Sequence, residues 1–180
     1  MHGHFFWITT RAAGSVCLVA ATVSLCIGLL MSGRMIRSRP PRDLRTVHEA
    51  LSLTALVALA IHALSLLADS FFRPNLLDIT VPFVSGYKEP WMSIGIIGGW
   101  ALAILGLSYY ARGLIGPGRW RRLHRWTAGA WALGLIHSIG EGTDNHRMWF
   151  LAMTGFVAVP ALALLVQRFS GTSQGSLTVR

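Results

Sequence analysis

The chain has 180 residues, of which 53% are hydrophobic and only 13% are charged, and its mean hydropathy is +0.52. This composition excludes an ordinary soluble globular domain, and several apolar runs reach the length of about 18–20 residues that a membrane-spanning helix needs. The net charge of +9 does not indicate nucleic-acid binding, because the arginines gather in short segments between the apolar runs. We therefore expect an all-α integral membrane protein, folded as a helical bundle.

About five transmembrane helices are expected in this bundle. The last of them contains Pro160, at which we expect a kink. In chain order the expected spans run from Gly14 to Met31, Thr46 to Ala68, Trp91 to Tyr110, Trp120 to Ile139 and Met148 to Val166. They form one transmembrane domain, residues 14–168. A short outer segment, 1–13, precedes it, and a flexible cytoplasmic tail rich in serine, glycine and threonine, 169–180, follows it.

The charges between the spans predict the orientation. Five arginines lie between the first and second spans, and five more surround the start of the fourth, whereas the other two connections are acidic or nearly neutral. By the positive-inside rule the basic connections face the cytoplasm, which places the N-terminus outside and the C-terminus inside. The expected location is the cell (inner or plasma) membrane, which the chain crosses several times.

The start of the second helix is predicted from a short motif. Thr46 and Glu49 match the T-x-x-E pattern of a capping box, in which both side chains bond to free backbone N–H groups at a helix start. The helix is therefore expected to begin at Thr46, with His48 in its first turn. The same motif gives Glu49 a capping role rather than a role in proton transfer.

Four histidines lie in the second and fourth spans. His48 and His62 are 14 residues apart, which on a helix separates them by about 21 Å along the axis and only about 40° around it. They therefore share one face, on which two of the three intervening residues are small. His124 and His137 lie at matching depths in the fourth span, which runs in the same direction as the second.

Two histidines at each of two depths are the arrangement that holds two stacked bis-histidine haems. A lone intramembrane histidine is more often a hydrogen-bonded packing residue, but four that pair by depth favour ligation of a cofactor. Zinc suits the sites less, because two rings leave its shell incomplete between apolar walls. Cys17 and Cys26 lie in no C-x-x-C-H motif, so covalent haem attachment is not expected.

The spacing in the fourth span does not fit an ideal helix. Thirteen residues separate its two histidines, and at about 100° per residue this places His137 about 140° away from His124. We therefore predict 3₁₀ winding, a bend or a shifted start between them. Gly129 and Gly134 lie between the histidines and are the expected positions of the irregularity.

In these features the chain resembles the ferric-reductase-like transmembrane domain. This family includes ferric reductases, NADPH oxidases and the membrane subunit of a methionine sulfoxide reductase system. The resemblance covers roughly residues 14–166 and is carried by "HEALSLTALVALAIHAL", "VPFVSGYKEPW", "WRRLHRW" and "HSIGEGTD". It implies two b-type haems, with the inner haem iron held by His48 and His124 and the outer haem iron by His62 and His137.

The resemblance also indicates what this chain lacks. Ferric reductases and NADPH oxidases continue into a flavin- and nicotinamide-binding domain, whereas only a short polar tail follows the fifth span here, without a G-x-G-x-x-G or Walker-type motif. The expected function is that of a membrane b-type cytochrome, the electron-transfer subunit of a transmembrane oxidoreductase. It would pass electrons across the bilayer from a separate flavoprotein or quinol to an unidentified acceptor.

Several other residues are candidates for the haem sites. Propionate groups need cationic partners, and three arginines lie within about a turn of the inner ligands: Arg45, Arg121 and Arg125. Positive-inside topology accounts for them equally well. Trp131, at mid-depth on the ligand face, is expected to contact a porphyrin. Outside, Lys88 and Arg147 are the candidates for propionates.

Three further histidines are expected on the outer side: His2, His4 and His146. We interpret them as solvated surface residues, although an outer metal or substrate site is an alternative. For the whole chain, the main alternative is a haem-free membrane anchor or assembly subunit, whose histidines only hydrogen-bond between helices. A proton-coupled transporter is disfavoured, because the spans contain almost no carboxylates.

Overall fold

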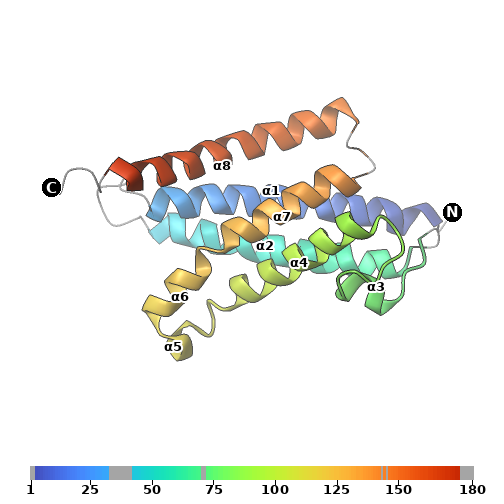
Figure 1. Ribbon diagram of the computed structural model, residues 1–180, viewed down its shortest axis with the longest axis horizontal. Coiled ribbons are helices and arrows are strands. Elements are labelled where there is room, and N and C mark those ends of the chain that lie inside the picture. Colours follow the sequence, from blue (N-terminus) through green and yellow to red (C-terminus); the bar gives the residue numbers. More distant parts are fainter. Residues whose placement is uncertain (1–2, 33–41, 70–71, 143, 145, 175–180) are drawn as a thin grey trace.

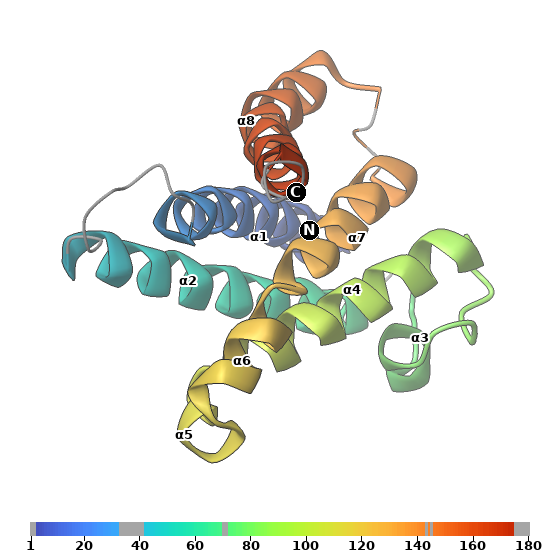
Figure 2. The same ribbon diagram turned by 60° about the vertical axis from the view of Figure 1, so that its left-hand side comes forward.

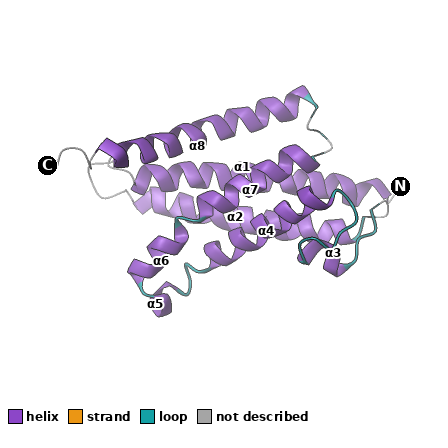
Figure 3. Ribbon diagram, in the orientation of Figure 1, coloured by secondary structure: helices purple, strands orange, loops and turns teal. Residues whose placement is uncertain are grey.

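The computed structural model describes residues 3–32, 42–69, 72–142, 144 and 146–174, and within these ranges the chain is helical with no strand (Figure 3). The all-α class predicted from the sequence is therefore confirmed. The helices of the described ranges are α1 (Gly3–Ser32), α2 (Arg42–Leu67), α3 (Leu76–Thr80), α4 (Glu89–Leu107), α5 (Arg112–Ile115), α6 (Pro117–His124), α7 (Thr127–Glu141) and α8 (Met148–Gln174).

Four of the described helices, α1, α2, α4 and α8, are long and apolar enough to cross a membrane. Large apolar side chains face outward on three of them, for example Leu64, Ile104 and Phe156, which are 66%, 63% and 83% exposed. Water would disfavour so much exposed apolar surface, whereas lipid tails would not. The chain is therefore a multi-pass membrane protein.

The fourth expected span, Trp120 to Ile139, is not one helix. It is divided into α6 and α7 at Arg125 and Trp126. Here the backbone bonds tighten to the 3₁₀ pattern, since the amide of Trp126 donates to Leu123 at 2.9 Å. The hydroxyl of Thr127 also donates to the carbonyl of His124 at 2.7 Å. The predicted irregularity exists, but its predicted position at Gly129 or Gly134 is wrong, because the winding changes where the arginine-rich segment becomes apolar.

The starts of the first two helices also differ from the prediction. α1 begins by Gly3 rather than at Gly14, and α2 is already helical at Arg42. The hydroxyl of Thr46 donates to the carbonyl of Arg42 at 3.2 Å, inside the helix. The predicted capping box of Thr46 and Glu49 is therefore wrong, because the turn before Thr46 leaves no free N–H group for it to cap.

The described helices pack as two antiparallel pairs. α1 packs along α2, and α4 packs along α7; α8 covers α1 on the side away from α2 (Figures 1 and 2). The two pairs meet mainly through α1 with α7 and α2 with α4, and no extensive contact joins α2 to α7 among the described residues. The helices that carry the histidines, α2 on one side and α6 and α7 on the other, therefore face each other without packing tightly.

The interior between α1, α7 and α8 is centred on a small group of buried side chains. Trp131 is buried there against Ala158 and Ala161. Its indole N–H donates to the hydroxyl of Thr22 at 2.8 Å, and that hydroxyl donates to the carbonyl of Leu18 at 2.6 Å. These bonds fix α7 to α1, and so determine how the histidine of α7 faces α2.

The last expected segments are only partly described. α8 continues to Gln174, past residue 169, where the flexible tail was expected to begin, and residues 175–180 lie outside the described residues. The start of α1 and helix α3 lie toward one end of the bundle, whereas α5, α6 and the end of α8 lie toward the other (Figure 1). The arginine-rich segment of α6 is therefore at the end opposite to α3.

Candidate functional site

The four histidines of the expected sites lie in two facing pairs. The ring centres of His48 and His124 are 6.3 Å apart, and those of His62 and His137 are 6.4 Å apart. The ring planes cross at 86° in the first pair and 81° in the second. The structure thus brings together the same partners that the sequence pairs by depth, and each pair connects α2 with the α6–α7 segment.

The distance between the ring centres distinguishes a pair of histidines that hydrogen-bond directly from a pair that shares a metal ion. A direct hydrogen bond of about 2.9 Å between two imidazole nitrogens would bring the ring centres within about 5.1 Å of each other. Two bonds of about 2.0 Å to a shared metal ion, with about 1.1 Å from each nitrogen to its ring centre, give about 6.2 Å instead. The observed separations match the second case. Each pair therefore has room for one metal ion, and no hydrogen bond joins the two rings of either pair.

Three of the four rings are oriented by a backbone carbonyl group. Nδ1 of His48 lies 2.9 Å from the carbonyl oxygen of Ser24. Nδ1 of His62 lies 2.8 Å from the carbonyl oxygen of Thr10, and Nδ1 of His137 lies 2.8 Å from that of Trp91. A carbonyl oxygen can only accept, so Nδ1 carries the proton in each ring. The lone pair of Nε2 is then free for a metal, which is the usual arrangement of a metal-ligating histidine.

His124 differs from the other three. Its Nδ1 atom is buried and makes no hydrogen bond, and the ring lies near the carbonyl group of Leu105. That carbonyl accepts from the hydroxyl of Ser108 at 2.6 Å. The ring instead stacks on Trp120, with ring centres 5.0 Å apart and planes at 27°. The orientation of His124 therefore depends on an aromatic contact within its own short helix.

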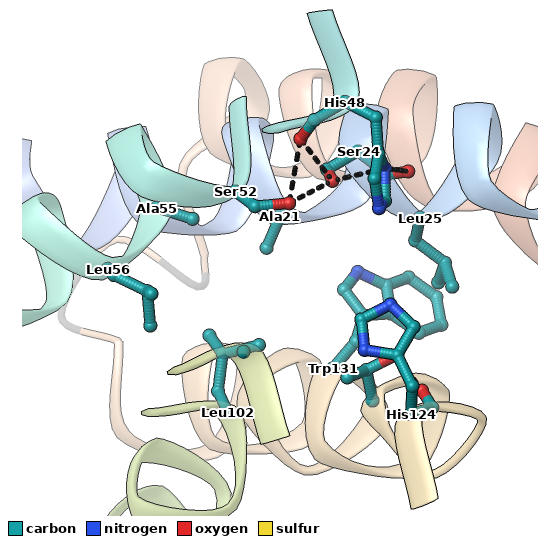
Figure 4. A pocket seen from close by; sticks show the side chains of 12 residues that line it. Ala21, Ser24, Leu25, His48, Ser52, Ala55, Leu56, Leu102, His124 and Trp131 are labelled. Atoms are coloured by element: carbon teal, nitrogen blue, oxygen red, sulfur yellow. Dashed lines mark hydrogen bonds between the residues drawn. The ribbon is translucent and has the colours of Figure 1, made fainter. Parts of the chain in front are cut away.

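A cavity lies between His48 and His124, which project toward each other across it (Figure 4). Its volume is about 60 Å³, well below the about 300–1,000 Å³ of typical small-molecule and cofactor sites. Small and apolar side chains line most of it: Ala21, Leu25, Ala55, Leu56, Leu102 and Trp131. Trp131 lines the cavity, and its contact with a porphyrin stays a prediction.

A second polar contact supports His48 from α1. The hydroxyl of Ser24 lies 2.9 Å from Nδ1 of His48 and 2.8 Å from the hydroxyl of Ser52, which itself donates to the carbonyl of His48 at 2.7 Å (Figure 4). Both serines line the cavity. The two hydroxyl groups thus bond to each other and to the backbone of His48, so neither is left unpaired at the cavity wall.

The cationic candidates lie outside this cavity. Arg45, Arg121 and Arg125 are exposed at the end of the bundle where His48 and His124 lie, and none of them lines the cavity. Their contact with propionates stays a prediction. Lys88 lies 5.9 Å from the ring of Tyr87, and Arg147 is exposed.

The remaining histidines and the cysteines take no part in either pair. His4 and His146 are exposed, as expected for solvated residues, and His2 lies outside the described residues. Cys17 and Cys26 are free thiols on α1. Those of them that the structure describes join no group of three or more histidine, cysteine or acidic side chains that could hold a metal ion.

Sequence reasoning missed an ion pair near His62. Arg11 pairs with Asp144, in the turn before α8, and its guanidinium also lies 4.0 Å from the ring of Trp7. Arg11 follows Thr10, the residue whose carbonyl orients His62. The sequence does show an arginine just before an apolar run. Because the first helix was expected to begin only at Gly14, Arg11 was assigned to the segment before the helix.

A carboxyl group lies one turn after His137. Glu141 ends α7, and one of its carboxyl oxygens is buried with no hydrogen-bond partner. Burial raises the pKa of Glu141, and the nearby charge of Lys88 opposes that rise. Among the described residues, Glu141 is the carboxyl group nearest in sequence to His137.

The two histidine pairs offer the donor set of bis-imidazole ligation and little else. Among the described residues, no group of three or more histidine, cysteine or acidic side chains gathers where it could hold a bare metal ion. A metal that takes its remaining ligands from a planar macrocycle, such as haem iron, suits two opposed rings. No family model, no curated protein and no solved structure matches the chain.

Proposed function

We propose that the chain is a membrane b-type cytochrome that holds two haems and passes electrons across the bilayer. The observation that carries this proposal is the pair of ring separations, 6.3 and 6.4 Å, which suit a metal between the rings and are too long for a direct hydrogen bond. The resemblance in sequence to the ferric-reductase-like transmembrane domain supports the same function. It also supports the cell membrane as the location.

In this function the residues of the chain would bind the haem iron, orient the ligands and exclude water. Nε2 of His48 and His124 would hold the inner iron, and Nε2 of His62 and His137 the outer iron. The backbone carbonyl groups keep three of these rings in the required tautomer. The apolar walls exclude water. When bound, each haem supplies a one-electron Fe(III)/Fe(II) couple, whose potential the ligands and the burial tune.

The topology that we propose lets two such centres connect the two sides of the membrane. α6 and α7 together form the fourth of five crossings, broken at Arg125 and Trp126, with the N-terminus outside and the C-terminus inside. Because α2 is one uninterrupted helix, His48 and His62 lie about 21 Å apart along its axis. Electrons from a separate flavoprotein or quinol would reach the inner haem first and the outer haem next.

A visible spectrum of the purified protein tests this function. The protein, produced with an ample haem supply, is expected to bind two b haems per chain, which acid acetone extracts because they are not covalently attached. The reduced spectrum should be that of low-spin bis-histidine haem. A protein without a Soret band would contradict the proposal and favour a haem-free anchor or assembly subunit.

A further inference from the structure

The three carbonyl groups that orient histidine rings share one feature of sequence. Each belongs to a residue that stands four positions before a glycine: Thr10 before Gly14, Ser24 before Gly28, and Trp91 before Gly95. The first two glycines lie on α1 and the third on α4. The pattern therefore occurs on both helices that pack against the histidine helices.

The glycines also touch the rings. A Cβ atom built on Gly28 would lie 3.2 Å from Cε1 of His48, and one on Gly14 would lie 3.0 Å from Nδ1 of His62. A Cβ atom on Gly95 would overlap the ring of His137. In each case the atoms nearest to that Cβ belong to the same histidine that the carbonyl four residues earlier binds.

Helix geometry explains why the glycine stands at that position. A carbonyl group in a helix already accepts from the N–H group four residues later, and its second lone pair points outward. The side chain of that later residue tilts toward the N-terminus of the helix and covers the turn before it. Glycine has no such side chain, so the second lone pair is open to an imidazole N–H.

The fourth histidine supplies the contrast within the same molecule. The ring of His124 lies near the carbonyl of Leu105, and the residue four positions later is Tyr109, not glycine. His124 is also the only one of the four rings without a Nδ1 hydrogen bond of ordinary geometry. The three rings with the bond thus have the glycine, and the one ring without the bond lacks it; the carbonyl of Leu105 also already accepts from the hydroxyl of Ser108.

We propose that Gly14, Gly28 and Gly95 are positioning residues for the haem ligands. Each opens one helix carbonyl to the Nδ1–H group of one histidine, and so sets both the orientation of the ring and the electron density on its Nε2 atom. This inference rests on the proposed function for its effect on haem. The hydrogen bonds and the glycine contacts belong to the protein itself.

Alanine substitutions test the proposal through the redox potentials of the two haems. Gly28→Ala is expected to lengthen the bond between His48 and Ser24, which makes the ligand less basic, stabilises Fe(III) less and shifts the inner potential to more positive values. Gly14→Ala and Gly95→Ala should shift the outer potential in the same direction. The shift should be largest for Gly95→Ala, where the overlap is greatest. Gly155→Ala on α8, where a Cβ meets nothing, is the matched control.

The grouping of the variants separates positioning from a general loss of helix packing. Gly14 and Gly28 share helix α1, so a packing defect in α1 would make their two variants alike. Positioning instead groups Gly14→Ala with Gly95→Ala, which lie on different helices but act on the same haem. Potentials that group by helix, or that equal the Gly155→Ala control in all three variants, would overturn the proposal.

A second measurement does not depend on redox behaviour. In ¹⁵N-histidine-labelled protein reduced with dithionite, low-spin Fe(II) is diamagnetic, and the wild type should show three Nδ1–H signals of hydrogen-bonded imidazole. Gly28→Ala should shift the signal of His48 and leave those of His62 and His137 in place. If the wild type held no haem, the proposed function would fail. The same spectra of the haem-free protein would still decide whether each glycine controls its histidine, with unchanged signals counting against it.

Discussion

The rings of His48 and His124 stand almost at right angles, with planes at 86° and centres 6.3 Å apart. His62 and His137 repeat this relationship at 81°. Perpendicular imidazole planes leave two d orbitals of a low-spin Fe(III) ion nearly equal in energy. We therefore expect both oxidised haems to give strongly anisotropic low-spin signals in electron paramagnetic resonance at low temperature. An ordinary rhombic spectrum would indicate that the rings turn parallel when haem binds.

Removal of single ligands should affect one haem at a time. His48→Ala and His124→Ala are each expected to lose the inner haem, and His62→Ala the outer one, as measured by haem content and by the potential of the haem that remains. The double variant of His48 and His124 should resemble either single variant, because both residues hold one group. His4→Ala, at an exposed histidine, is the control and should keep both haems. Loss of one common haem in His48→Ala and His62→Ala would contradict the pairing.

The potential of the outer haem should depend on pH through Glu141. Burial raises the pKa of this carboxyl group, and oxidised haem, with its extra positive charge, favours the carboxylate more than reduced haem does. Reduction should therefore be accompanied by proton uptake, so the outer potential falls as pH rises through the titration range of Glu141. Glu141→Gln should remove this slope and hold the potential near the low-pH value of the wild type. A redox titration at several pH values measures this, with the inner haem as internal reference.

The ion pair of Arg11 and Asp144 should stabilise the outer end of the bundle. It joins α1 to the turn before α8, and its side chains are 31% and 13% exposed, so solvent screens it only in part. A double-mutant cycle with Arg11→Met and Asp144→Asn is expected to give a coupling energy of about 1 kcal/mol in the free energy of unfolding. Denaturation in mixed micelles measures it. A coupling energy indistinguishable from zero would show that the two residues act independently.

The arginine-rich surface of α6 is the expected docking site of a flavoprotein donor. Arg119 and Arg122 are exposed there, and Arg42 is exposed at the start of α2; residues 33–41, with further arginines, lie outside the described residues. Charge reversal at Arg119 should slow reduction by an acidic donor several-fold and leave the spectrum intact, and added salt should slow the wild type likewise. His146→Glu, which adds a negative charge at an exposed residue before α8, is the control. Rates that respond to neither change would favour a quinol donor.

The histidine pairing could be predicted from the sequence because it depends on distances that a helix keeps constant. The rise per residue places His48 and His62 at two depths on one face, and the alternation of loop charges aligns the fourth span with the second. The break between α6 and α7 could be anticipated from the 13-residue spacing. Its position at Trp126 could not, because it depends on where an arginine-rich segment meets the apolar one rather than on the flexible glycines.

The supporting contacts were beyond prediction for a different reason. A glycine such as Gly28 cannot be recognised from the sequence as a contact of a histidine, because its span contains many small residues. Its role follows only when α1 is known to lie antiparallel to α2, with Ser24 beside His48. Once that neighbour is known, the matching separations become visible: Thr10 and Ser24 are as far apart on α1 as His48 and His62 are on α2.

Because of the break at Arg125 and Trp126, the two histidine pairs differ in how firmly their second histidine is held. His137 belongs to α7, which Trp131 fixes to α1, whereas His124 belongs to α6, a helix of eight residues beyond the break. The inner site can open when α6 alone rotates, but the outer site opens only when two long helices move apart. We therefore expect a chain starved of haem to fill its outer site first and to exchange its inner haem more readily.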